Sequence, residues 1–89
     1  MEFSIGQVVI SKAGRDKGGA FIITSHDGEY AYLVDGKTRP LANPKRKKMK
    51  HLQPTHTVCE TIKSAVKGRE YMKDADFRSA LAAFNGKGR

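Results

Sequence analysis

The chain has 89 residues and a formal net charge of +8, with 38% apolar and 29% charged residues. A chain of this length forms one small domain, or a minimal domain with an appendage, and its composition is globular rather than disordered. The excess of cations favours a polyanionic partner, either a nucleic acid or an anionic membrane surface.

No apolar run approaches the roughly 18 residues needed to span a bilayer, and the N-terminal residues lack the pattern of a signal peptide. We therefore expect a cytoplasmic protein. The single cysteine, Cys59, cannot form an internal disulfide, which fits a reducing compartment.

Two runs of β-forming residues, Gln7 to Lys12 and Ala20 to Ser25, flank a glycine-bounded loop that presents Arg15 and Lys17. The loop does not fit a nucleotide-binding P-loop, because the motif needs Lys and Ser or Thr where Ala and Phe follow Gly19. The sequence therefore predicts two strands joined by a charged turn.

Both faces of these two strands carry apolar residues. In the first strand, Val8 and Ile10 share one face, and Val9 shares the other with Ser11. If one face packs on a core, the other face needs a cover from elsewhere in the chain.

Turn signals continue the β pattern. Asp27-Gly28 precedes a predicted third strand, Glu29 to Val34, and Asp35-Gly36 precedes a fourth, Lys37 to Ala42, in which Pro40 indicates an edge position. A last short strand, Met49 to Gln53, would let the sheet curl and close its edges. We predict a mainly β domain built as a small five-stranded barrel.

The positive charge is concentrated in one part of the chain. From position 35 to 53 there are seven Lys and Arg against one acid, so this fifth of the chain holds six of the eight net charges. Its centre is the run Lys45-Arg46-Lys47-Lys48. A solvated basic loop and a nuclear localisation signal are the alternatives to a phosphate-binding segment.

The residues after Pro54 have helical character. Thr57-Val58-Cys59-Glu60 has the form of a capping box, and the helix that follows should end near Gly68. A second helix is predicted from Asp74 to Phe84, with an apolar stripe formed by Phe77, Leu81 and Phe84. We expect a barrel domain over residues 1–53 and a helical extension, of one or two short helices, over residues 54–89 that covers the outer face of the sheet.

Tyr30 and Tyr32 fall on the same face of the third predicted strand. Such a pair is a candidate platform for stacking RNA bases, and half-buried packing is the alternative role. Both interpretations place the rings at the sheet surface.

The sequence offers little for metal binding or catalysis. His56 and Cys59 have a ligand-like spacing without a second pair, and no nucleophile, base and orienting residue can be assembled. We expect no cofactor, no metal and no enzyme activity.

The segment Gly6 to Gly18, together with Val34-Asp35-Gly36 and Lys50-His51-Leu52, resembles the KOW motif and its surroundings in small bacterial KOW-domain RNA-binding proteins. Those proteins are similar to KOW-bearing large-subunit ribosomal proteins of archaea and eukaryotes. The resemblance covers residues 4 to 53, with Gly14 and Gly18 at the motif glycines. It implies an SH3-like barrel that contacts RNA, often ribosomal RNA.

We therefore predict a non-catalytic, ribosome-associated RNA-binding module that grips phosphate through two basic loops, the glycine-bounded loop and the run from Lys45 to Lys48. Ribosomal or transcription proteins are further candidate partners. The alternative is a protein-interaction module of the same SH3-like type that docks a partner through the barrel or the helical stripe. A peripheral membrane binder would need a long cationic amphipathic helix, which the chain lacks. The cations predicted to contact RNA are Lys12, Arg15, Lys17, Lys37, Arg39, Lys45, Arg46, Lys47, Lys48 and Lys50.

Overall fold

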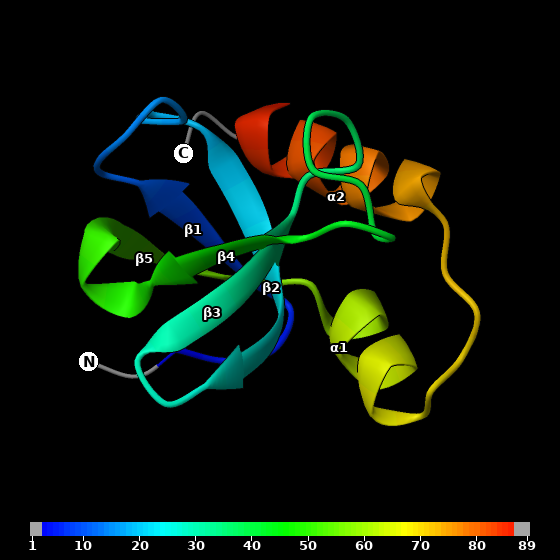
Figure 1. The fold of residues 1–89 in the computed structure, drawn as a ribbon. Helices are drawn as coiled ribbons and strands as arrows, with labels where there is room; N and C mark the ends of the chain where they lie inside the picture. Colours follow the sequence, from blue (N-terminus) through cyan, green and yellow to red (C-terminus); the bar gives the residue numbers. More distant parts are fainter. Residues whose placement is uncertain (1–2, 87–89) are drawn as a thin grey trace.

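The computed structural model describes residues 3–86 and shows a five-stranded antiparallel sheet followed by two helices (Figure 1). The mainly β prediction and the two helices are confirmed. The strands lie in the order β4-β3-β2-β1-β5. Their bounds, with those of a short 3-10 helix η1, are β1 Gln7–Ser11, β2 Ala20–Asp27, β3 Tyr30–Val34, β4 Lys45–Lys48, η1 Met49–His51, β5 Leu52–Val58, α1 Glu60–Lys67 and α2 Asp74–Gly86.

The fourth strand lies later than predicted. Residues 37–42 form turns, because the Asp35 carboxylate accepts hydrogen bonds from the backbone N–H groups of Lys37 and Arg39 and from the Thr38 hydroxyl, each at 2.8 Å. An aspartate that bonds the following backbone in this way favours a turn over a sheet ladder. The fourth strand is instead β4, so the basic run predicted as a loop is an edge strand.

The fifth strand was also predicted too early. Residues 49–51 form η1, and β5 continues to Val58, across the predicted boundary between residues 53 and 54. Pro54 pairs with Val9 inside this strand. A proline is tolerated there because β5 is an edge strand.

The start of α1 differs from the prediction, whereas its end agrees. Thr57 belongs to β5, and the residue that precedes the helix is Cys59, whose side chain makes no capping hydrogen bond. The predicted capping box is therefore wrong, since the chain is still extended at Thr57. Gly68 is the C-cap, as the sequence indicated.

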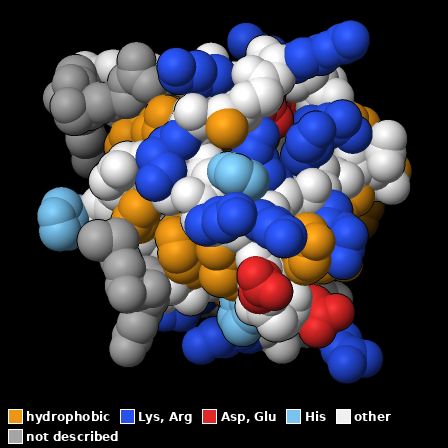
Figure 2. All heavy atoms as spheres, turned by 60° about the vertical axis from the view of Figure 1, so that its left-hand side comes forward, with side chains coloured by type: hydrophobic (Ala, Val, Ile, Leu, Met, Phe, Trp, Pro, Cys, Tyr) orange, Lys and Arg blue, Asp and Glu red, His pale blue; other side chains and the backbone are white. Residues whose placement is uncertain are grey.

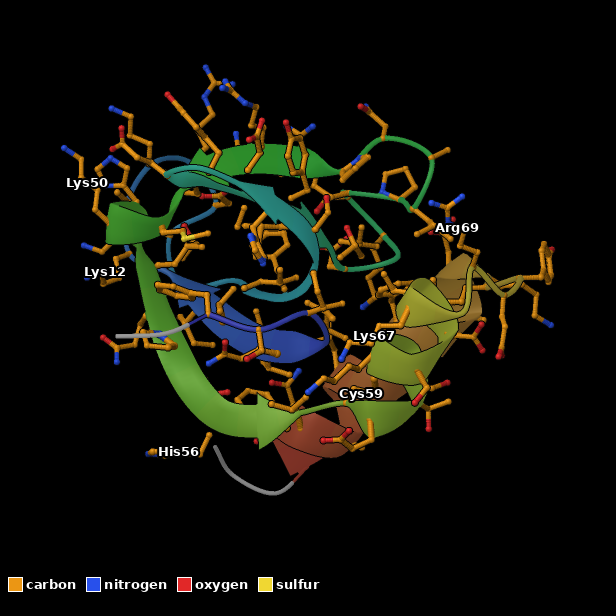
Figure 3. All side chains as sticks on the ribbon, turned by 90° about the horizontal axis from the view of Figure 1, so that it is seen from below. Lys12, Lys50, His56, Cys59, Lys67 and Arg69 are labelled. Atoms are coloured by element: carbon orange, nitrogen blue, oxygen red, sulfur yellow. The ribbon has the colours of Figure 1, made fainter. Side chains whose placement is uncertain are left out.

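The sheet is curved but not closed. Its two edges, β4 and β5, are joined by η1 and are not neighbours in the sheet, so the structure does not confirm the expected barrel. Register shifts in the β1–β5 and β2–β3 ladders accompany the bending, as β-bulges do. Seen from below, β5 curves from η1 round to α1 (Figure 3).

Apolar side chains form one cluster on each face of the sheet. Alternation along β1 sends Val8 to one cluster and Val9 to the other, as predicted. The helices cover the Val8 face, and the predicted stripe is buried against it, with Phe77, Leu81 and Phe84 exposed by 0, 6 and 7%. This stripe is therefore part of the core and is not a free surface for a partner. Within residues 3–86, neither helix has the length and apolar character required to cross a bilayer.

Candidate nucleic-acid interface

The register of β4 separates its four cations into two pairs. Lys48 lies opposite Tyr30 and Arg46 opposite Tyr32, so these four side chains share one face. Lys47 lies opposite Ala31 and Lys45 opposite Leu33, on the face that holds the apolar cluster of Val9. We call these the outer and inner faces of β4.

On the inner face, Lys47 is held by the loop between β1 and β2. Its Nζ donates to Asp16 Oδ1 at 2.6 Å and to the Ala13 carbonyl at 2.7 Å. The Lys47 and Asp16 side chains are only 10 and 21% exposed. Because two of the three ammonium donors are used within the protein, Lys47 has a structural role here, whereas the sequence had grouped it with the predicted RNA-binding residues.

The Asp16 carboxylate is also anchored within its own loop, since the Ser11 hydroxyl lies 2.7 Å from Oδ1. Burial opposes ionisation of Asp16, but the hydrogen bonds from Lys47 and Ser11 and the charges of Lys47 and Lys45 outweigh it and hold the pKa of the carboxyl below its usual value. Asp16 is therefore a stable anion that fastens the loop to β4.

The loop has the turn geometry that its glycines predicted. Gly14 and Gly18 adopt φ values of +85° and +89°, which favour glycine. The Gly18 N–H donates to the Ser11 carbonyl at 2.8 Å and closes the loop at its base. Arg15 and Lys17 are exposed on either side of the anchored Asp16. Two basic segments some thirty residues apart in the sequence thus lie side by side.

On the outer face, aromatic rings and cations are in contact. The Arg46 guanidinium lies 3.6 Å from the centre of the Tyr30 ring, and Lys48 Nζ lies 5.9 Å from it. Arg46 is exposed, while Lys48, Tyr30 and Tyr32 are half-buried. The two tyrosines share a face as predicted, but Arg46 covers one side of Tyr30, which leaves Tyr32 as the better candidate for base stacking.

The remaining predicted cations lie around this region. The Lys12 N–H donates to the His51 carbonyl at 2.8 Å, which places Lys12 beside η1, the short helix that carries the exposed Lys50 (Figure 3). Lys37 is exposed and Arg39 half-buried in the turn that Asp35 organises. In Figure 2, Lys and Arg side chains gather across the face turned forward, and acidic side chains lie mainly towards its lower edge.

The sequence did not predict two features of this surface. The sequence places Asp16 in the glycine-bounded turn, but nothing in it identifies Lys47, one of four adjacent cations, as the partner of Asp16. The second feature is a cleft of about 300 Å³ between the β1–β2 loop and the segment before β4, lined by Arg15, Asp16, Phe21, Thr38, Arg39 and Lys45. The spacing of acids and bases along the chain indicates neither feature, because both depend on how the sheet folds.

The part of the chain that the structure describes contains no group of three His, Cys, Asp or Glu side chains able to hold a metal. His56 lies on β5 and Cys59 at the start of α1, and the two side chains are well separated in Figure 3. A scan against protein-family models and a search of curated proteins found no match for this chain.

Proposed function

We propose that this protein is a non-catalytic RNA-binding module that contacts RNA phosphates through β4 and the loop between β1 and β2. The observation that carries this proposal is the Lys47–Asp16 ion pair, which fastens a loop bearing Arg15 and Lys17 beside a strand bearing Arg46 and Lys48. The four side chains come from two neighbouring elements, and cations gathered in this way suit a backbone of regularly spaced negative charge.

Phosphate contacts of this kind give affinity without sequence discrimination. Discrimination would come from bases stacked on Tyr32 or from RNA shape. The resemblance to KOW-domain proteins points to ribosomal RNA as the target, with ribosomal or transcription proteins as neighbours. A cytoplasmic location follows from that target.

The proposal is tested by fluorescence anisotropy with a labelled single-stranded RNA at several salt concentrations. If four cations neutralise phosphates, log K should fall with log salt at a slope near about −3. A slope near zero would exclude the phosphate-binding mechanism.

A charge reversal gives a second test on the same assay. Lys48→Glu should weaken binding to many RNA sequences alike, because phosphate contacts do not depend on the base. The matched control is Lys67→Glu, which makes the same change at an exposed position of α1, on the side away from Lys12 and Lys50 (Figure 3). Equal losses from the two variants would argue for a general charge effect and against a β4 surface.

The alternative function, docking of a protein partner, loses its most specific candidate surface. Phe77, Leu81 and Phe84 would have to leave the core to contact a partner. A protein partner would then have to bind the cationic surface itself. Such a complex would form without RNA, and added RNA would weaken it by competing for the same cations.

A further inference from the structure

The cleft beside Phe21 brings together three cations from two segments. Arg15 comes from the β1–β2 loop, Arg39 from the segment before β4, and Lys45 is the first residue of β4 itself. Within residues 3–86, none of these three forms an ion pair. Arg15 is exposed, and Arg39 and Lys45 are half-buried, so all three heads can reach a molecule in the cleft.

The one acid in the cleft does not balance these charges. Asp16 is already paired with Lys47 at 2.6 Å and bonded to Ser11. The cleft therefore keeps an excess of positive charge, because Asp16 also attracts Lys45 but is already paired with Lys47. Like charges in a concave site repel one another and focus a positive potential, and an anion that enters the cleft relieves that repulsion.

The walls of the cleft are fixed by contacts that do not use the three cationic heads. The Lys47–Asp16 ion pair positions the loop that carries Arg15. On the other wall, Asp35 accepts from the backbone N–H of Arg39 at 2.8 Å, which leaves the Arg39 guanidinium free of that bond. Guanidinium groups bind phosphate oxygens through two parallel N–H donors, so two arginines on fixed walls suit a phosphate group.

We infer that this cleft binds one phosphate group of an RNA chain, held between Arg15 and Arg39 with Lys45 at its base. The inference rests on the proposed RNA-binding function and adds a defined phosphate-binding site to it. Cations outside the cleft, such as Lys17 and Lys37, meet phosphates at the exposed surface, where solvent and salt screen the contact.

Two pairs of variants of the full chain test the cleft, because each pair removes the same charge from the same segment. Arg15→Gln is compared with Lys17→Gln, and Arg39→Gln with Lys37→Gln, by anisotropy with a labelled single-stranded RNA. Loss of a screened cation should weaken binding about fourfold at physiological salt. Loss of a direct charge-assisted contact should weaken it by at least about tenfold. Thermal unfolding should be unchanged in all four variants, since each side chain is at least partly exposed.

A titration with inorganic phosphate, followed by NMR of the labelled protein, gives a readout without RNA. The largest shifts should fall on Arg15, Arg39 and Lys45, and Arg39→Gln should abolish them while Lys37→Gln leaves them. Equal losses within both pairs of variants, or phosphate shifts spread over all exposed cations, would overturn the cleft and leave RNA binding intact. A parent protein that binds no RNA and shows no salt dependence would instead remove the proposed function itself.

Discussion

The two faces of β4 carry the same charge in different surroundings. On the inner face, Lys47 is 10% exposed and bonded to Asp16, so it holds the β1–β2 loop in place. On the outer face, Arg46 is exposed and lies over the Tyr30 ring, where it can meet a ligand. A run of cations is therefore not one functional unit, because the pleat of the strand alternates structural and binding positions.

Charge reversal on the inner face should have the largest effect. Lys47→Glu removes the partner of a largely buried carboxylate and places a second carboxylate beside it, and should lower the free energy of unfolding by about 2–3 kcal/mol. The neighbouring Lys48→Glu should stay within about 0.5 kcal/mol of the parent. Denaturant unfolding of both variants measures the difference, and equal stabilities would refute the assignment of Lys47 as the structural cation.

Removal of the outer-face charges should weaken RNA binding and leave the stability of the fold unchanged. The double variant Arg46→Gln with Lys48→Gln should bind single-stranded RNA about tenfold more weakly and lower the magnitude of the salt slope by about 1.4. The matched control removes two exposed cations at the end of α1 by Lys67→Gln with Arg69→Gln (Figure 3). An unchanged slope in the outer-face variant would mean that β4 does not contact phosphate.

Acid should weaken the ion pair on the inner face and lower the free energy of unfolding. The pKa of Asp16 is lowered in the folded state, because burial is outweighed by its bonds to Lys47 and Ser11. Its contribution to the free energy of unfolding is therefore fully present above the unfolded pKa of about 3.9 and is lost as pH falls through the folded pKa. Asp16→Asn should therefore show a shallower fall in stability below about pH 4. Part of the fall should persist, because Asp35 is also lowered; burial opposes its ionisation, and hydrogen bonds from Arg39, Lys37 and Thr38 outweigh it. Parallel pH profiles for parent and Asp16→Asn would contradict the role of the ion pair.

The smallest expected effect is the coupling energy between Tyr30 and the two cations of the outer face. A double-mutant cycle on Tyr30→Leu and Arg46→Gln should give a coupling of about 0.5–1 kcal/mol for the contact at an exposed site. The same cycle with Lys48→Gln should give less, because Lys48 Nζ lies at 5.9 Å instead of 3.6 Å. Coupling energies in the reverse order would show that Arg46 is not held on the ring in solution.

Local sequence signals were reliable where one residue type decides the backbone. The glycines at 14 and 18, the alternation of Val8 and Val9, and the helix end at Gly68 all follow from rules within a few residues, and the structure confirms each of them. The same rules failed at positions 37–42. Pro40 and the Asp35-Gly36 signal indicated an edge strand, but the three hydrogen bonds to the Asp35 carboxylate hold the segment as a turn.

The sequence by itself determined that the chain is mainly β, ends in helices with an apolar stripe, and concentrates positive charge around residues 45–50. Only the tertiary structure decided which of those charges is free. Whether a lysine binds a phosphate or an internal aspartate depends on which segment lies opposite it, and Asp16 lies 31 positions from Lys47 along the chain. Sequence periodicity reports only on residues close together in the chain, so it cannot pair these two residues. The curvature of the sheet brings them into contact.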